Sequence, residues 1–226
     1  MRILLLGHGR MGKLVESLAP SYDATIAGVI DEHSGDDAIS NSDFGGVDVA
    51  IDFTLADAVP KNLPRLAARK INVVIGTTGW QDHEEKMRAI AQDAGIGVLA
   101  ASNFSLGMNI FQLAVEEASR HFAQHAEFGA WIHESHHVMK KDAPSGTALT
   151  IKSGMEHAGY QRPIDVSSTR VGAVPGTHTV GFDGPSETIE LTHTVRDRAV
   201  FARGALTAAG WLAGKQGWFS IRDMLT

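Results

Sequence analysis

The chain has 226 residues, of which 43% are hydrophobic and 20% are charged, as is ordinary for a folded globular protein. Its formal net charge of −6 argues against a nucleic-acid partner, which usually meets a basic face, and the lack of cysteine excludes a disulfide framework and a thiolate metal site. No apolar run approaches the roughly 20 residues of a membrane helix, and a strand-like run begins the chain. We therefore expect no membrane anchor, no secretory signal and a cytoplasmic location.

The first predicted element is a buried parallel strand at residues 2–6, because this short run is continuously apolar. A G-x-G-x-x-G motif at residues 7–12 and an amphipathic helix at 13–19 follow directly. Such glycines allow a tight turn, close approach of the backbone to a pyrophosphate, and close packing of helix on strand. A second strand at 24–30 ends at Asp31, where a carboxylate can bind the adenosine ribose. We predict a dinucleotide site; the alternative is a flavodoxin-like or ligand-free α/β domain.

Strands and helices then alternate up to residue 104. Residues 33–46 are polar and predict a surface loop, and 47–53 predict a third strand, with Thr54 as a candidate cap for the next helix. Within that helix Pro60 suits a first turn, whereas Pro64 predicts a kink or a break. Strands are expected at 71–75 and 96–100, with a helix at 81–94 between them. This alternation predicts a doubly wound parallel sheet with ligands outside the strand C-termini, where residues 76–79 and 101–104 lie.

The pattern changes after a long predicted helix at residues 106–122. We expect a strand at 127–133, a helix at 145–157, and strands at 166–171, 177–182 and 187–195. A turn at 183–185 predicts antiparallel pairing of the last two strands, with helices over one face. A final helix is expected at 202–212. The fold class is therefore α/β: an N-terminal Rossmann-type, doubly wound parallel sheet plus a smaller α+β domain with a mixed, largely antiparallel sheet.

Residues 133–149 are the most informative stretch. His133, His136 and His137 are followed by two lysines, and a Ser-Gly-Thr turn then opens an apolar-periodic run. Pro144 disfavours helix at the preceding residue, so hydroxyls and unpaired backbone N–H groups lie at a helix N-terminus, which is an anion site. Cations beside this helix end indicate a small acidic ligand.

Two other interpretations of this stretch compete. The letters of residues 133–137 fit H-E-x-x-H, but the zinc-protease signature requires a helix, and the preceding residues favour a strand. We expect no metal. Alternatively, the stretch is a solvated loop in which Ser145 only caps a helix, although capping does not explain His136, His137 and Lys140 together.

Several motifs occur in one order along nearly the whole chain. They are Gly9-Arg10-Met11-Gly12, Asp52-Phe53-Thr54, Gly76-Thr77-Thr78-Gly79, Ser102-Asn103-Phe104-Ser105, and His136-His137 through Lys140 to Asp142-Ala143-Pro144-Ser145-Gly146-Thr147-Ala148. In these motifs the chain resembles dihydrodipicolinate reductase, also called 4-hydroxy-tetrahydrodipicolinate reductase, of the lysine and diaminopimelate pathway. The resemblance implies hydride transfer from NADH or NADPH to a cyclic dicarboxylate, with loss of water.

The resemblance also implies roles for individual residues. His136 becomes the general acid and Lys140 a second proton donor, while His137, Ser145, Gly146 and Thr147 bind substrate carboxylates. Cofactor-binding positions are Gly7, His8, Gly9, Arg10, Met11, Gly12, Asp31, Gly76, Thr77, Thr78, Ala101, Ser102, Asn103 and Phe104. Residues 1–104, with a C-terminal helix at about 205–226 returning to them, are expected to bind the dinucleotide. Residues 105–204 are expected to bind substrate and to form a homotetramer.

Some positions depart from the family pattern. Val138 and Met139 fill a spacer that often holds a basic residue, and Glu32 and His33 follow the ribose acid where some members carry arginine. Asp31 and Glu32 together favour NADH over NADPH, because a 2′-phosphate would meet their negative charges. Two alternatives stay open: another two-domain dehydrogenase of the aspartate or homoserine type, and a non-catalytic dinucleotide sensor.

Overall fold

The computed structural model describes residues 1–35, 38–44 and 46–226. The chain forms two units, of which unit 1 comprises Met1–Ser105 with Ala199–Thr226 and unit 2 comprises Leu106–Arg198. The chain thus re-enters unit 1 at Ala199, earlier than the expected return at about 205. Within the described residues, no helix combines the length and apolarity needed to cross a bilayer.

Unit 1 contains a six-stranded sheet in the order β10-β5-β4-β3-β1-β2, with parallel pairing throughout. Its strands are β1 (Arg2–Leu6), β2 (Thr25–Ile30), β3 (Val49–Asp52), β4 (Asn72–Ile75), β5 (Gly97–Ala100) and β10 (Gly217–Phe219). The inner strands β1 and β3 are buried along almost their whole length because helices cover both faces, which explains their continuous apolar runs. The strand order reverses between β1 and β3, and ligands of open α/β sheets bind at such a reversal.

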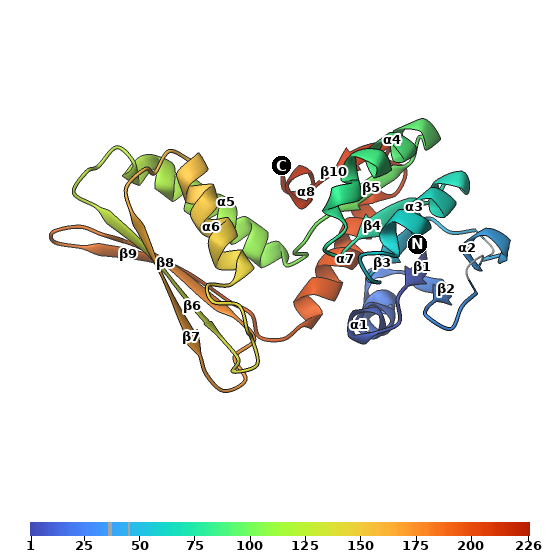
Figure 1. Ribbon diagram of the computed structural model, residues 1–226, viewed down its shortest axis with the longest axis horizontal. Coiled ribbons are helices and arrows are strands. Elements are labelled where there is room, and N and C mark those ends of the chain that lie inside the picture. The colour runs from blue at the N-terminus through green and yellow to red at the C-terminus, as the bar shows by residue number, and fades with distance from the viewer. Residues whose placement is uncertain (36–37, 45) are drawn as a thin grey trace. The chain divides into compact units, whose positions relative to one another are not determined.

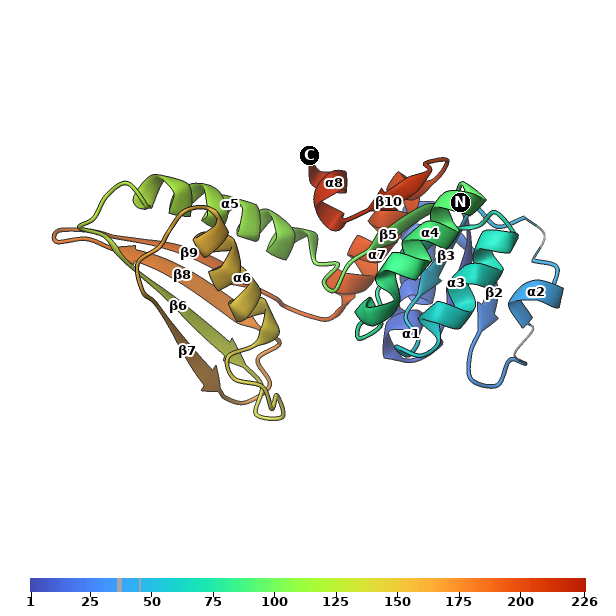
Figure 2. The same ribbon diagram turned by 45° about the horizontal axis from the view of Figure 1, so that its top comes forward.

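The helices of unit 1 are α1 (Arg10–Leu18), α2 (Ala38–Asn41), α3 (Val59–Ala68), α4 (Glu84–Ala94), α7 (Ala199–Leu212) and α8 (Ile221–Leu225), with 3-10 turns η1 (Ala19–Tyr22) and η2 (Gln81–His83). Helix α1 packs with α7, and α3 packs with α4. Figures 1 and 2 show these two pairs on opposite faces of the sheet. The predicted doubly wound arrangement is confirmed.

Unit 2 contains a four-stranded sheet in the order β7-β6-β8-β9. Its elements are α5 (Leu106–Phe122), β6 (Gly129–His136), α6 (Gly146–His157), β7 (Ile164–Arg170), β8 (Thr177–Asp183) and β9 (Thr188–Thr194). β6 pairs parallel with β7 and antiparallel with β8, and β8 pairs antiparallel with β9, so the sheet is mixed and largely antiparallel as predicted. Helices α5 and α6 pack together over one face of the sheet (Figure 2). Burial along β6 accordingly alternates from residue to residue.

Several local expectations were wrong. The predicted loop at 33–46 contains the short helix α2, while residues 36, 37 and 45 of that stretch lie outside the described residues. Thr54 does not cap α3, because the helix begins only at Val59 with Ala58 as its N-cap. The Thr54 hydroxyl instead donates to Asp52 Oδ1 at 2.5 Å. Pro64 lies inside α3 without ending it.

The C-terminal region also differs from expectation. The predicted final helix begins earlier, at Ala199, and ends at Leu212, after which the chain forms β10 and α8 instead of continuing as helix to 226. Strand β10 pairs with β5 and so adds the sixth strand to the sheet. In unit 2, β6 runs on to His136, so the first residues of the histidine motif belong to a strand.

Candidate active site

The glycine motif of unit 1 forms the turn between β1 and α1. Gly7 adopts a φ of +87°, and a Cβ there would lie 2.4 Å from the Phe53 carbonyl oxygen. A Cβ on Gly12 would lie 2.0 Å from the Gly7 carbonyl oxygen, so the helix can approach the turn this closely only without a side chain. A Cβ on Gly9 would meet nothing within 4 Å, which leaves open space at the N-cap of α1. These three positions fit the backbone demands of a bound pyrophosphate.

The other expected cofactor residues follow the ends of neighbouring strands. Backbone hydrogen bonds link these ends in series: Gly7 N to Ile30 O at 2.8 Å, Phe53 N to Leu6 O at 2.9 Å, Gly76 N to Asp52 O at 2.9 Å, and Ala101 N to Ile75 O at 3.1 Å. The structure therefore brings together residues 7–12, Asp31, 76–78 and 101–104 along one edge of the sheet. His8, however, directs its ring to Glu16, with 2.7 Å between Nε2 and Oε2.

Asp31 follows β2 and takes part in a local turn. Its Oδ1 accepts hydrogen bonds from His33 N at 3.0 Å and from the Ser34 hydroxyl at 3.3 Å. The hydrogen bond from the His33 backbone is the main cause that lowers the pKa of the Asp31 carboxyl below its ordinary value. Asp31 is therefore a fixed negative charge beside the glycine turn at neutral pH.

A buried carboxylate joins two of the strand-end loops. Asp52, the last residue of β3, is 1% exposed. Its Oδ1 accepts from Thr54 N and Thr77 Oγ1, each at 2.9 Å, and its Oδ2 accepts from the Asn62 amide at 3.2 Å. The Thr77 side chain is therefore held in place by Asp52, which the sequence motif contained but to which no role had been assigned.

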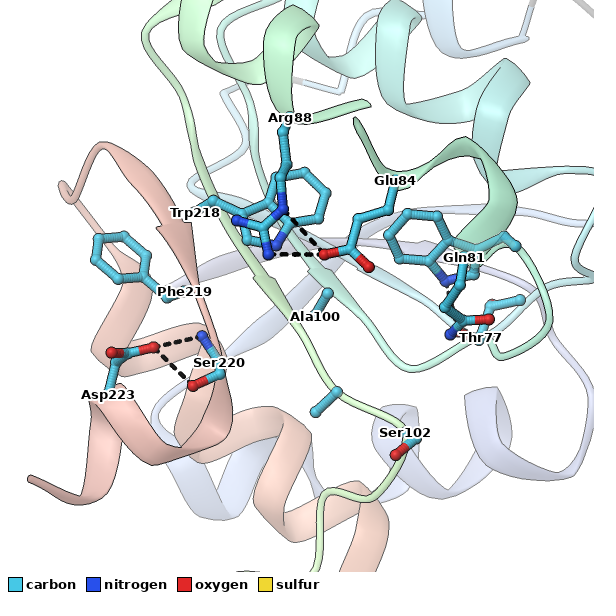
Figure 3. Close-up of a pocket in the computed structure, with 12 residues that line it drawn as sticks. Thr77, Gln81, Glu84, Arg88, Ala100, Ser102, Trp218, Phe219, Ser220 and Asp223 are labelled. Carbon is cyan, nitrogen blue, oxygen red and sulfur yellow. Dashed lines mark hydrogen bonds and ion pairs between the residues drawn. The ribbon is translucent and has the colours of Figure 1, made fainter. Parts of the chain in front are cut away.

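Unit 1 also contains a pocket of about 460 Å³ at the ends of β4, β5 and β10. Thr77, Ala101 and Ser102, all expected cofactor residues, form part of its lining. In Figure 3 the opposite wall carries Glu84 and Arg88, whose Nη2 lies 2.7 Å from the carboxylate, and the Arg88 guanidinium lies 4.7 Å from the ring centroid of Trp218. Trp218 was not among the residues predicted for the cofactor site, because strand β10 was not predicted from the sequence.

In unit 2 the histidine motif starts on a strand, and this decides which side chains meet. Successive strand residues point to opposite faces, so Glu134 and His136 face the helices whereas His133 does not. His133 Nδ1 instead lies 2.9 Å from the Ser167 hydroxyl. The H-E-x-x-H letters therefore do not have the helical geometry of a zinc protease. Among the residues that the structure describes, no cluster of three or more His, Asp or Glu suits a metal ion.

Glu134 is completely buried and lies at the centre of a charged network. Its carboxylate accepts from Arg170 Nη1 at 3.0 Å, Arg170 Nη2 at 2.7 Å and Ser145 N at 3.2 Å, and it makes a short contact with His136 Nδ1. Burial alone would raise the pKa of Glu134, but hydrogen bonds from Arg170, Ser168 and His136 lower it to about 2. The carboxylate is therefore ionised at all ordinary pH values.

His136 and Lys140 lie close to this network. His136 is 8% exposed, and burial lowers its pKa, against the opposing effect of Glu134. Lys140 Nζ lies 2.9 Å from Asp142 Oδ1, and its charge also lowers the pKa of His136. The structure thus brings together the two residues expected to donate protons.

Helix α6 begins at Gly146, with Ser145 as its N-cap, as predicted. The Ser145 hydroxyl accepts from Ala148 N at 3.2 Å and lies 3.2 Å from His178 Nε2. His178 is 3% exposed, and burial lowers its pKa to about 4, so its ring is neutral at pH 7. Gly146 is exposed and Thr147 is half-buried, which leaves the first turn of the helix accessible to a ligand.

Residues outside the predicted set complete the network. In the sheet, Arg170 on β7 is the register partner of His136, and His178 on β8 is the register partner of Glu134. The period of two places Glu134 on the same strand face as His136, a signal that was present in the sequence. Nothing in the sequence pattern indicated the partners from β7 and β8, because they depend on strand register.

Comparisons with known proteins find relatives that match both units. The family models "Dihydrodipicolinate reductase, N-terminus" and "Dihydrodipicolinate reductase, C-terminus" match residues 1–104 and 107–225. A 4-hydroxy-tetrahydrodipicolinate reductase of Christiangramia forsetii is 37% identical over 239 residues, covering 100% of this chain and 98% of the relative. One of Methanoregula boonei is 37% identical over 251 residues, covering 99% and 97%.

Solved structures share the fold. A dipicolinate-bound dihydrodipicolinate reductase from Paenisporosarcina sp. TG-14 superposes with a TM-score of 0.82 at 19% identity, covering 97% of each chain. A probable dehydrogenase from Thermotoga maritima gives a TM-score of 0.62 at 11% identity, covering 99% of this chain and 92% of that one. The two family models together span both units, and the sequence relatives match over the full length. The chain therefore belongs to the dihydrodipicolinate reductase family.

Proposed function

We propose that this chain reduces 4-hydroxy-tetrahydrodipicolinate to tetrahydrodipicolinate with NADH or NADPH, a step of lysine and diaminopimelate biosynthesis. The reaction consumes one hydride and one proton and releases water. The observation that carries the proposal is the buried network of Glu134, His136 and Arg170 beside the N-terminus of α6, in a chain that matches named reductases over its full length.

Unit 1 would hold the dinucleotide. Gly7, Gly9 and Gly12 leave the backbone approach that a pyrophosphate needs, and the N-terminus of α1 favours its negative charge. Thr77, Ala101 and Ser102 line a pocket at the ends of the central strands, where the other end of the cofactor would bind. When bound, the reduced nicotinamide supplies the hydride.

Unit 2 would hold the cyclic dicarboxylate. Backbone N–H groups of Gly146 and Thr147 at the start of α6 suit one carboxylate, and the Lys140 ammonium suits the other. His137, half-buried directly after β6, adds a further donor. The solved relative from Paenisporosarcina is described as bound to dipicolinate, a flat ring with two carboxylates, which supports this ligand class.

His136 is the proposed proton donor. Its Nδ1 is engaged by Glu134, so Nε2 is the nitrogen available to substrate. Imidazole titrates closer to working pH than the other side chains present, as a general acid requires. Lys140 supplies a nearby positive charge and is the proposed second donor.

One experiment separates this function from the alternatives. NADH absorbance is followed with enzymatically generated substrate, with aspartate semialdehyde as a control. We expect oxidation of NADH only with the cyclic substrate. Oxidation with aspartate semialdehyde alone would identify another dehydrogenase, and NADH binding without turnover of either compound would identify a sensor.

Calorimetry with pyridine-2,6-dicarboxylate in the presence of NADH should show binding competitive with substrate; no binding would contradict the dicarboxylate site.

We further propose that NADH is preferred over NADPH. Asp31 carries a negative charge next to the glycine turn, and exposed Glu32 follows it. A 2′-phosphate there would be repelled, whereas a 2′-hydroxyl can donate to the carboxylate. Equal or better kcat/KM with NADPH would overturn this preference.

The family resemblance also leads us to propose a homotetramer in the cytoplasm. The absence of cysteine is compatible with a reducing compartment. Light scattering coupled to size-exclusion chromatography measures the assembly directly. A mass of a single chain at micromolar concentration would contradict the tetramer.

A further inference from the structure

Glu134 is a fully buried charge that is hydrogen-bonded by side chains from two strands and by the backbone at the start of α6. Both Nη atoms of Arg170 donate to it, at 2.7 and 3.0 Å, and Ser145 N donates at 3.2 Å. Its remaining short contact is to His136 Nδ1. One carboxylate therefore connects the proposed general acid to the helix end proposed to bind the substrate.

The contact with Glu134 determines how the His136 ring presents its two nitrogens. An ionised carboxylate only accepts hydrogen bonds, so Nδ1 must carry a proton and donate a hydrogen bond to Glu134. Nε2 is then the nitrogen that gains or loses a proton. A Cβ on Gly176 would lie 3.0 Å from Nε2, and Gly176 has a φ of +150°, so a glycine keeps the space beside Nε2 free.

Arg170 fixes the carboxylate in turn. It is the register partner of His136 on β7, and Nη2 also makes a short hydrogen bond to the Asp142 carbonyl oxygen. Asp142 binds Lys140 at 2.9 Å through its own carboxylate. The network therefore extends from Arg170 on β7 through Glu134 to His136, and through Asp142 to Lys140.

We infer that Glu134, anchored by Arg170, is a positioning residue for catalysis: it orients the His136 ring with Nε2 toward the substrate and favours the charged form of that ring. This inference rests on the proposed function. Without Glu134 the ring can rotate or adopt the other tautomer, and the anchor of Ser145 at the start of α6 is lost as well.

Among the groups around His136, Glu134 is the one that raises the pKa of its ring. His178 on β8 has its ring centroid 5.1 Å away and is neutral, while Lys140 and Arg170 both lower the pKa of His136. Burial also lowers it. Removing this negative charge must therefore lower the pKa of His136, and an opposite charge at contact distance typically accounts for about 1–3 pH units.

The test is Glu134→Gln in the full-length protein, with Glu190→Gln as a control at an exposed position of β9. A general acid loses activity as the pH rises through its pKa. We expect Glu134→Gln to move this alkaline loss of kcat to lower pH by about 1–3 units. At the pH optimum of the wild type, kcat should fall by about tenfold or more, up to the roughly 10²–10⁴-fold that general acid catalysis contributes in full. Glu190→Gln should change neither quantity.

Nuclear magnetic resonance of the His136 ring nitrogens provides a readout that does not depend on turnover. In the wild type, neutral His136 should carry its proton on Nδ1, and Glu134→Gln should give a tautomer mixture and a lower pKa. If Glu134→Gln lowers kcat without moving the pH profile or the ring pKa, Glu134 is merely structural and the inference is wrong.

Glu134→Asp covers the case in which the glutamine variant does not fold. Aspartate keeps the charge but is one methylene shorter, so kcat should fall while the alkaline limb stays within about half a unit of the wild type, well below the shift expected from charge removal. A shift as large as that expected for glutamine would contradict the inference. If the wild type shows the predicted tautomer but does not turn over the cyclic substrate, the proposed function fails while the role of Glu134 toward His136 stands.

Discussion

In unit 1 the inner strands are buried and apolar, and the residues proposed to bind the cofactor follow the strand ends. In unit 2, β6 is buried only at every second residue, and Glu134 and His136 stand on the strand itself. The unit 1 site accordingly depends on glycine backbone and close approach, whereas the unit 2 site depends on charges held by side chains across the sheet. We therefore expect an added Cβ at the glycine turn to weaken cofactor binding in unit 1. Removal of a charged side chain should reduce catalysis in unit 2.

In unit 2, one face of the sheet carries both core residues and site residues, in neighbouring rows across the strands. Val166, Ile132, Val180 and Leu191 form one apolar row across β7, β6, β8 and β9. Two residues further along β6, Ser168, Glu134, His178 and His193 form a polar row on the same face. The apolar row packs against α5 and α6. Of the polar row, Glu134 and His178 meet Ser145 at the start of α6, whereas the His193 ring lies against Phe111 of α5.

His136→Gln tests the charge-dependent site most directly. Glutamine cannot act as a general acid, so kcat should fall by about 10²–10⁴-fold, with little change in NADH affinity. His157→Gln, at an exposed position of α6, is the matched control and should keep full activity. Steady-state kinetics with circular dichroism decides. A folded His136→Gln enzyme that keeps more than about a third of the wild-type kcat would contradict the role, since that loss is far below the general-acid range.

Lys140→Ala should lower kcat and raise KM together, because it removes both a proton donor and a charge that binds a carboxylate. We expect a combined loss in kcat/KM of about 10²-fold or more, as for loss of a charge-assisted contact worth roughly 3 kcal/mol. The neighbouring exposed Lys141→Ala serves as the control and should change kcat/KM less than about twofold. An unchanged KM in Lys140→Ala would show that this residue does not bind substrate.

Acid should weaken unit 2 before unit 1. The pKa of Glu134 is lowered from 4.5 to about 2, so the stability it contributes is present above 4.5 and is lost as the pH falls toward 2. The pKa of His178 is lowered from 6.5 to about 4, so the unfolded state binds the extra proton and stability falls between pH 6.5 and 4. Each of the two pKa shifts corresponds to a change on the order of 3 kcal/mol in the free energy of unfolding.

Hydrogen exchange between pH 7 and pH 3 can resolve the two units. Amides of β6, β7 and β8 should lose protection at a higher pH than those of β1, β3 and β4. Earlier loss in the parallel sheet of unit 1 would contradict the comparison.

Gly12→Ala tests the backbone-dependent site. The added Cβ would lie 2.0 Å from a backbone oxygen, which cannot move aside as a flexible side chain can. We expect a loss of about 1–3 kcal/mol in unfolding free energy and NADH binding weaker by about tenfold. Gly210→Ala in α7 is the control, since its Cβ would meet nothing within 4 Å and should leave NADH affinity unchanged. Calorimetry measures the affinities; wild-type NADH affinity in Gly12→Ala would contradict the close approach.

Asp31→Ala should give the smallest effect. Loss of the charge removes repulsion of a 2′-phosphate and a hydrogen bond to the 2′-hydroxyl, so the preference for NADH should narrow by several-fold, consistent with about 1 kcal/mol. The kcat at saturating NADH should stay within about twofold, because Asp31 binds and does not take part in the chemical step. Asp93→Ala, exposed on α4, is the control. A collapse of kcat at unchanged NADH affinity would refute the binding role.

The sequence by itself determined the elements whose pattern is local. Continuous apolar runs predicted the buried strands of unit 1, and alternation together with a turn at 183–185 predicted the antiparallel pair β8 and β9. The glycine motif in its strand–turn–helix context and the N-cap at Ser145 were also readable, because each depends on a few consecutive residues.

Tertiary structure decided what depends on partners distant in sequence. Strand β10 has three residues and gains its hydrogen bonds from β5, more than 110 positions earlier, so no local pattern indicates it. Arg170 and His178 reach Glu134 and His136 only through the register of β7 and β8 on either side of β6. A buried carboxylate needs several hydrogen-bond donors to remain charged. The sequence contains these donor residues but does not show which of them the strand register places beside Glu134. The sequence therefore identified the residues proposed for the chemistry, and the fold supplied the groups that hold them.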